Sequence, residues 1–117
     1  MKPQAAPISA VYVVTELIPK LNTVEKHIEQ TISAVLDASQ LPTQIERYTK
    51  LQIEFQLELT MIRMNLEHLL KRYHRELEVV MNDPRKDVLL TLDQHESVAV
   101  ESAKALYERV QRLQQAR

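Results

Sequence analysis

The sequence predicts an all-α protein, an elongated antiparallel three-helix bundle with up-down-up topology, and allows a short additional N-terminal helix before Pro19. The 117 residues include no Gly, which disfavours the tight positive-φ turns of hairpin-rich β folds. Leu, Glu, Gln, Lys, Arg, Ala and Met are abundant, and these residues lose little conformational entropy in a helix. Long apolar series with spacings of three and four are separated by corners that contain Pro, as expected for helices packed in a bundle.

A chain of this length is expected to form one domain. We divide it into a disordered leader, residues 1–7, and a single helical-bundle domain, residues 8–117. The first helix is expected over about 8–38, kinked or broken at Pro19, because Pro lacks the amide hydrogen and crowds the preceding turn. Its apolar face consists of Val14, Leu17, Leu21, Val24, Ile28, Ile32 and Val35.

The second helix is expected over 43–82. Pro42 interrupts the chain before it, and Thr43 with Glu46 fits a capping box. No breaker follows before the next corner, so the helix would be about 60 Å long. Its predicted core positions are Tyr48, Leu51, Phe55, Leu59, Ile62, Leu66, Leu70, Tyr73, Leu77 and Met81.

The third helix is expected over 84–116, with Asp83 as N-cap and Pro84 as the first helical residue. Its predicted apolar face consists of Val88, Leu92, His95, Ala99, Ala103, Leu106, Val110 and Leu113. Short corners between long helices make consecutive helices antiparallel neighbours.

Composition limits the function classes. Fifteen Lys and Arg stand against sixteen Asp and Glu, so no strong field recruits nucleic acid or an anionic membrane. The absence of Cys excludes disulfides and Cys-ligated zinc. No apolar run approaches the roughly 20 residues of a membrane span, and the N-terminal apolar patch lacks a signal-peptide cleavage pattern. We expect no membrane association and a cytoplasmic location, with a nuclear one as the alternative.

The stretch "LQIEFQLEL", residues 51–59, alternates apolar and polar residues like a half-buried strand. Its Leu, Gln and Glu residues favour a helix, and the stretch lies in phase with the surrounding helical series. On a helical wheel, Ile53, Leu57, Met61 and Met64 then form a second apolar stripe opposite the core face. We predict that this stripe binds a partner protein, either a second copy or a different helical protein. The alternatives are that residues 8–18 fold back over it, or that nothing covers it.

No motif for chemistry outweighs this interpretation. Glu-x-x-His pairs and His-Glu-x-x-His, which bind metals on helices, are both missing. We therefore expect no metal site, no cofactor and no enzymatic activity. The main prediction is a protein–protein interaction module, such as an adaptor, an assembly subunit or a small chaperone-like partner, that acts by coiled-coil-like helix packing as part of an oligomer.

Two alternatives stay open. The segment around His68, "EHLLKR", resembles the His-x-Leu-Lys-Gly signature of histidine phosphotransfer domains, which are helical bundles of about this size. The match covers His68, Leu70 and Lys71, while Arg72 stands where that family has Gly. The resemblance implies a signalling domain with His68 as phosphoacceptor. The second alternative is weak nucleic-acid binding through Lys71, Arg72 and Arg75, a basic cluster interleaved with Glu residues.

Overall fold

The computed structural model describes residues 6–115, and most of them are helical. The all-α prediction is confirmed. Most of the predicted leader, residues 1–5, lies outside the described residues, while Ala6 and Pro7 are exposed and non-helical.

The first helical segment runs through Pro19 without a break. It consists of α1 (Ala10–Tyr12), one π-helical turn η1 (Val13–Leu17) and α2 (Ile18–Ala38) in direct succession. The amide of Ile18 bonds to the carbonyl of Val13, five residues earlier. This wider turn stands just before Pro19, where the ring would crowd an α-helical turn. The inserted residue also shifts the phase, so that Val13 is buried and Val14 only partly so.

A distant segment caps this helix at its N-terminus. Strand β1 (Ile8–Ser9) pairs antiparallel with β2 (Leu89–Leu90). Ser9 Oγ accepts a hydrogen bond from the Tyr12 amide at 3.2 Å and donates one to Asp87 Oδ2 at 2.6 Å. Asp87 Oδ1 accepts from the Val11 amide at 2.9 Å. These bonds from the Ser9 hydroxyl and the Val11 amide hold the pKa of Asp87 below its ordinary value.

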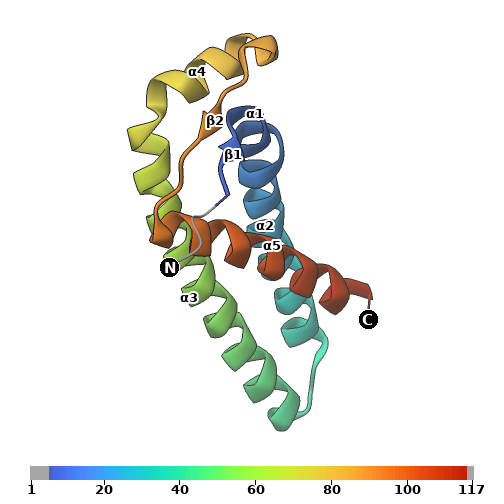
Figure 1. Ribbon diagram of the computed structural model, residues 1–117. Coiled ribbons are helices and arrows are strands. Elements are labelled where there is room, and N and C mark those ends of the chain that lie inside the picture. The colour runs from blue at the N-terminus through green and yellow to red at the C-terminus, as the bar shows by residue number, and fades with distance from the viewer. Residues whose placement is uncertain (1–5, 116–117) are drawn as a thin grey trace.

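The long second helix is divided in two. α3 (Pro42–Arg72) ends at Tyr73, and α4 (His74–Asn82) leaves in a different direction (Figure 1). Neither Gly nor Pro stands at this point, and the interruption coincides with hydrogen bonds from Arg72 and Tyr73 to Thr91. At the other end, Pro42 occupies the first turn and Leu41 provides no side-chain cap. The buried side chains of α3 are Phe55, Leu59, Ile62, Leu66 and Leu69.

The third helix starts much later than expected. In place of a helix over 84–116, the chain forms a 3-10 turn η2 (Pro84–Lys86), then β2, and then α5 (Gln94–Gln115). Asp83 does act as a cap, since its side chain accepts from the Arg85 amide at 3.1 Å, but only for that one turn. The segment beyond it is extended because its backbone pairs with β1, a long-range contact that local helix signals do not reveal.

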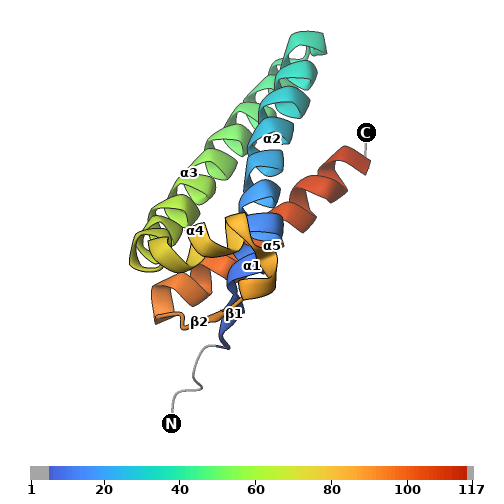
Figure 2. The same ribbon diagram turned by 90° about the horizontal axis from the view of Figure 1, so that it is seen from above.

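The helices form an open, elongated assembly. α2 and α3 lie side by side as an antiparallel hairpin, and α5 crosses both obliquely (Figures 1 and 2). α4 and the β1–β2 pair close one end. The radius of gyration is 16.8 Å and the extents are 52 × 37 × 22 Å, against a radius of about 13 Å for a compact domain of this length. Among residues 6–115, four helices exceed two turns, rather than three.

One core joins α2, α3, α4 and α5. Its fully buried large side chains include Leu17, Ile28, Ile32, Phe55, Leu69, Leu90 and Leu106. The core ends well short of the corner between α2 and α3, because no side chain of residues 33–54 is buried. This end of the hairpin projects beyond α5 (Figure 1).

Candidate functional site

The predicted apolar stripe lies on the outer face of α3, facing solvent. The exposed fractions of Ile53, Leu57, Met61 and Met64 are 52%, 63%, 65% and 66%. We call these four residues the outer stripe. The opposite face of the same helix carries the buried side chains of the core, so α3 is apolar on two sides although the described chain packs against only one of them.

Residues 8–18 do not cover the outer stripe. They pair with β2 and pack against α4 and α5 instead, because the strand pairing and the Ser9–Asp87 cap fix them at the other side of the molecule. This observation removes the intramolecular alternative for residues 8–18.

Other exposed apolar side chains lie away from the outer stripe. Leu41 and Ile45, at the projecting end of the hairpin, are 62% and 40% exposed, and Met81 is 70% exposed. The prediction that Met81 belongs to the core was wrong. Leu77 and Val80 continue the buried face of α3 into α4. Met81, one position after Val80, lies outside that face.

A second notable feature is a buried carboxylate at the start of α5. The side chain of Glu96 is 1% exposed. Its Oε1 accepts from the Asp93 amide at 2.8 Å, and Asp93 Oδ1 accepts from the Glu96 amide at 2.7 Å. This reciprocal pair is a capping box, formed by Asp93 and Glu96 rather than by the predicted Thr43 and Glu46.

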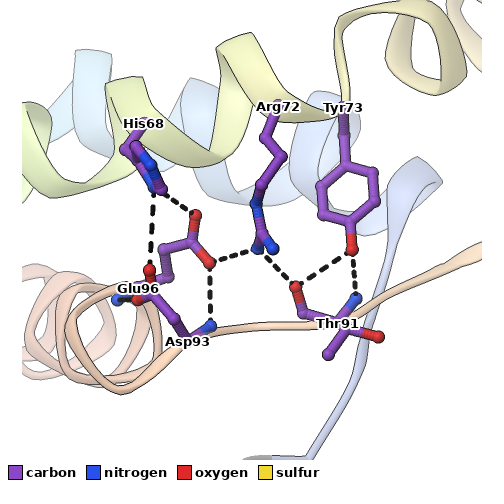
Figure 3. A network of polar contacts seen from close by, with 6 residues as sticks. All are labelled: His68, Arg72, Tyr73, Thr91, Asp93 and Glu96. Atoms are coloured by element: carbon purple, nitrogen blue, oxygen red, sulfur yellow. Dashed lines mark hydrogen bonds and ion pairs between the residues drawn. The ribbon is translucent and has the colours of Figure 1, made fainter.

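Side chains from the end of α3 complete this cluster (Figure 3). Arg72 Nη2 donates to Glu96 Oε1 at 2.5 Å and to the Thr91 carbonyl at 2.7 Å. His68 Nδ1 lies 3.1 Å from Glu96 Oε2 and 3.6 Å from Asp93 Oδ2. Tyr73 Oη bonds to both the carbonyl and the amide of Thr91. The cluster thus fixes the start of α5 against the end of α3 and gives the buried carboxylate polar partners.

His68, Asp93 and Glu96 have the donor types of a metal site. One ligand atom from each lies within 4.8 Å of the others. However, both oxygens of Glu96 are already engaged by protein groups, and the Arg72 guanidinium places a positive charge at the same carboxylate. These contacts account for the arrangement of the three side chains as part of a charged helix cap.

The other predicted residues are placed as follows. The His68 side chain is 66% exposed. Lys71 pairs with Glu67 at 2.9 Å on the surface, and Arg75 is exposed. Because the Arg72 guanidinium is directed to Glu96, the structure does not gather Lys71, Arg72 and Arg75 into one basic strip.

Sequence reasoning missed Glu96 altogether. It placed His95 on the apolar face of the last helix, whereas His95 is exposed and Glu96 is buried. The available signal was the Asp-x-x-Glu spacing of Asp93 and Glu96, which marks a helix start. The Asp83–Pro84 pair carries a similar start signal earlier in the chain, and the helix start is therefore predicted there.

A shallow groove between α2 and α3 offers a further surface. One hollow in it has a volume of about 250 Å³ and is lined in part by Ile28 and Leu59. Arg63 of α3 bridges the two helices by bonding to Asn22 Oδ1 at 3.1 Å and Glu25 Oε2 at 2.8 Å. The groove is smaller than a usual small-molecule site.

Within residues 6–115, no helix combines the length and the apolar character needed to cross a bilayer. Comparison with protein-family models, curated proteins and solved structures finds no match for this chain.

Proposed function

We propose that the protein is a non-enzymatic protein–protein interaction module, acting as an adaptor, an assembly subunit or a small chaperone-like partner. The supporting observation is the outer stripe, four large apolar side chains on one face of a 31-residue helix, each more than half exposed. The partner packs a helix along this face. The two Met residues suit such a surface because their side chains adapt to the shape of the partner.

The free energy available supports this proposal. Burying the exposed part of these four side chains would contribute about 4–7 kcal/mol, taking about 1.5–3 kcal/mol for full burial of each. That gain is comparable with the whole net stability of a small domain, about 5–15 kcal/mol. Apolar surface concentrated on one helix face in this way marks interaction sites more often than it serves a monomer.

Photo-crosslinking tests the proposal. A photoreactive amino acid replacing Leu57 is expected to form a covalent adduct with another protein chain when the protein is irradiated in its own cells. The same amino acid replacing Met81, which is equally exposed but lies on α4, serves as the control. Absence of any protein adduct at position 57 would contradict the proposed function.

A double substitution supplies the complementary test. Leu57→Glu with Met61→Glu is expected to abolish association and leave the helical circular dichroism unchanged, because both side chains face solvent. Leu41→Glu with Met81→Glu introduces the same charge at other exposed apolar positions and is expected to retain association. Association that survives the Leu57 and Met61 substitutions would remove the outer stripe as the contact.

One observation favours a second candidate function, phosphotransfer through His68. Both contacts of the ring use Nδ1, which leaves the exposed Nε2 side to accept a phosphoryl group. Carboxylates that hold Nδ1 orient the imidazole. Incubation with a phosphorylated response-regulator domain would then give an acid-labile label that His68→Gln abolishes, and a lack of label on the unaltered protein would remove this candidate.

A further inference from the structure

We propose that the partner on the outer stripe is a second copy of this chain, packed antiparallel so that the two α3 helices are related by a two-fold axis between Leu57 and Met61. This inference rests on the proposed function and specifies its partner. It is argued from the order of charges and apolar side chains along the outer face of α3.

The outer stripe is flanked by an exposed ion pair at each end. Glu46 and Lys50 lie 3.1 Å apart before it, and Glu67 and Lys71 lie 2.9 Å apart after it. The positions follow one another at intervals of three or four residues, which keeps them on one side of the helix. In order, the residues are Glu46, Lys50, Ile53, Leu57, Met61, Met64, Glu67 and Lys71.

This order is complementary to itself when it is reversed. A two-fold axis perpendicular to α3, between Leu57 and Met61, brings each residue opposite one at about the same distance on the other side of the axis. The pairs are Leu57 with Met61, Ile53 with Met64, Lys50 with Glu67, and Glu46 with Lys71. Each apolar side chain therefore faces an apolar one, and each charge faces its opposite.

The antiparallel direction follows from the same charges. In a parallel pair in register, Lys50 would face Lys50 and Glu67 would face Glu67, and like charges across a helix interface oppose association. The intervals between positions also match an antiparallel coiled coil, in which apolar layers fill the centre and charged residues close the ends.

The geometry of α3 permits this contact. The helix is unbroken from Pro42 to Arg72, so the surface extends over about 38 Å at 1.5 Å per residue. The four charged side chains are 61% to 76% exposed, and the outer stripe faces away from the core. Each intrahelical ion pair can therefore also contact the second chain without unpacking the first.

Disulfide trapping tests the direction and register. The chain has no Cys, so Ile53→Cys and Met64→Cys each introduce a single thiol at an exposed position. A mixture of the two variants is expected to form a disulfide-linked heterodimer under mild oxidation. Either variant alone is expected to stay unlinked, because identical residues would lie about 16 Å apart along the axis, too far for a disulfide. Self-linking of Ile53→Cys, as in a parallel pair, would overturn the inference.

Charge reversal tests the end contacts. By sedimentation equilibrium, Lys50→Glu is expected to weaken the dimer by about tenfold or more, because it sets two Glu residues against each other at both ends. Lys50→Glu with Glu67→Lys is expected to restore the dimer, because the opposite charges are exchanged. Circular dichroism checks that all variants stay helical. Equal weakening by the single and the double variant would overturn the inference.

The outcome for the unaltered chain separates this inference from the proposed function. A monomer at every concentration up to the millimolar range overturns the inference. If the photoreactive residue at position 57 then forms adducts with a different protein, the proposed function stands without self-association. If it forms none, both fail.

Discussion

The buried carboxylate of Glu96 gives a quantitative prediction. Replacing Arg72 by Met removes the partner at 2.5 Å and leaves Glu96, 1% exposed, with the Asp93 amide and His68. Removing one member of a buried ion pair costs about 3–5 kcal/mol. Because the Arg72 side chain is 39% exposed, water can partly solvate the carboxylate in the variant, and we expect a loss of about 2–4 kcal/mol.

Thermal unfolding followed by circular dichroism at fixed protein concentration measures this loss. For a domain of this size about 4 °C corresponds to 1 kcal/mol, so the midpoint should fall by about 8–16 °C. Arg85→Met, which removes a 90% exposed Arg paired with Asp83, is the matched control and should lower the midpoint by about 4 °C at most, because an exposed pair contributes no more than about 1 kcal/mol. Adding Glu96→Gln to Arg72→Met should recover part of the loss, because no buried charge then lacks its partner. A fall of less than about 1 kcal/mol, the value of an exposed pair, would refute the argument.

Two other predictions concern the ends of the helices. The folded pKa of Asp87 is below the ordinary 3.8, so its stabilising contribution is complete above that pH and is lost as the pH falls through the lower folded value. Asp87→Asn should therefore make the urea unfolding midpoint fall less steeply as the pH drops below about 4. Part of the remaining fall comes from Asp83, because Arg85 also lowers its pKa. An unchanged dependence of the midpoint on pH would contradict the role of Asp87. No side chain of residues 33–54 is buried. In native-state hydrogen exchange, the amides of these residues should therefore exchange well before those of residues 55–69. Equal protection of the two segments would contradict this prediction.

Features that depend on local sequence were largely predictable. The helical class and the buried face of α2 and α3 follow from apolar spacing, because one face of each helix meets the core. The outer stripe could be located in the same way, since Ile53 and Leu57 lie out of phase with Phe55 and Leu59. The sequence also indicated the cap at Asp83, although not how short the capped turn would be.

Features that depend on distant contacts were not predictable. Nothing in the residues around Tyr73 breaks a helix, and the interruption accompanies contacts with Thr91, 18 positions later. Likewise, the segment 87–90 becomes extended only because residues 8–9 pair with it. The buried position of Glu96 depends in turn on where α5 begins and on Arg72, so the cluster could not be predicted before the break in α3 was known.

The cap supplied by Asp87 has a consequence for synthesis. The first turn of the N-terminal helix is completed by a residue 76 positions further along the chain, whereas α2 and α3 are neighbours in sequence. On the ribosome, the hairpin of α2 and α3 therefore emerges before Asp87, which caps the helix before α2, and before Thr91 and Glu96, which contact the end of α3. Its core face stays uncovered until α5 has been translated, and a nascent chain that stops before residue 87 presents this apolar face to chaperones and proteases. Native packing of the core therefore requires that α5 has been translated.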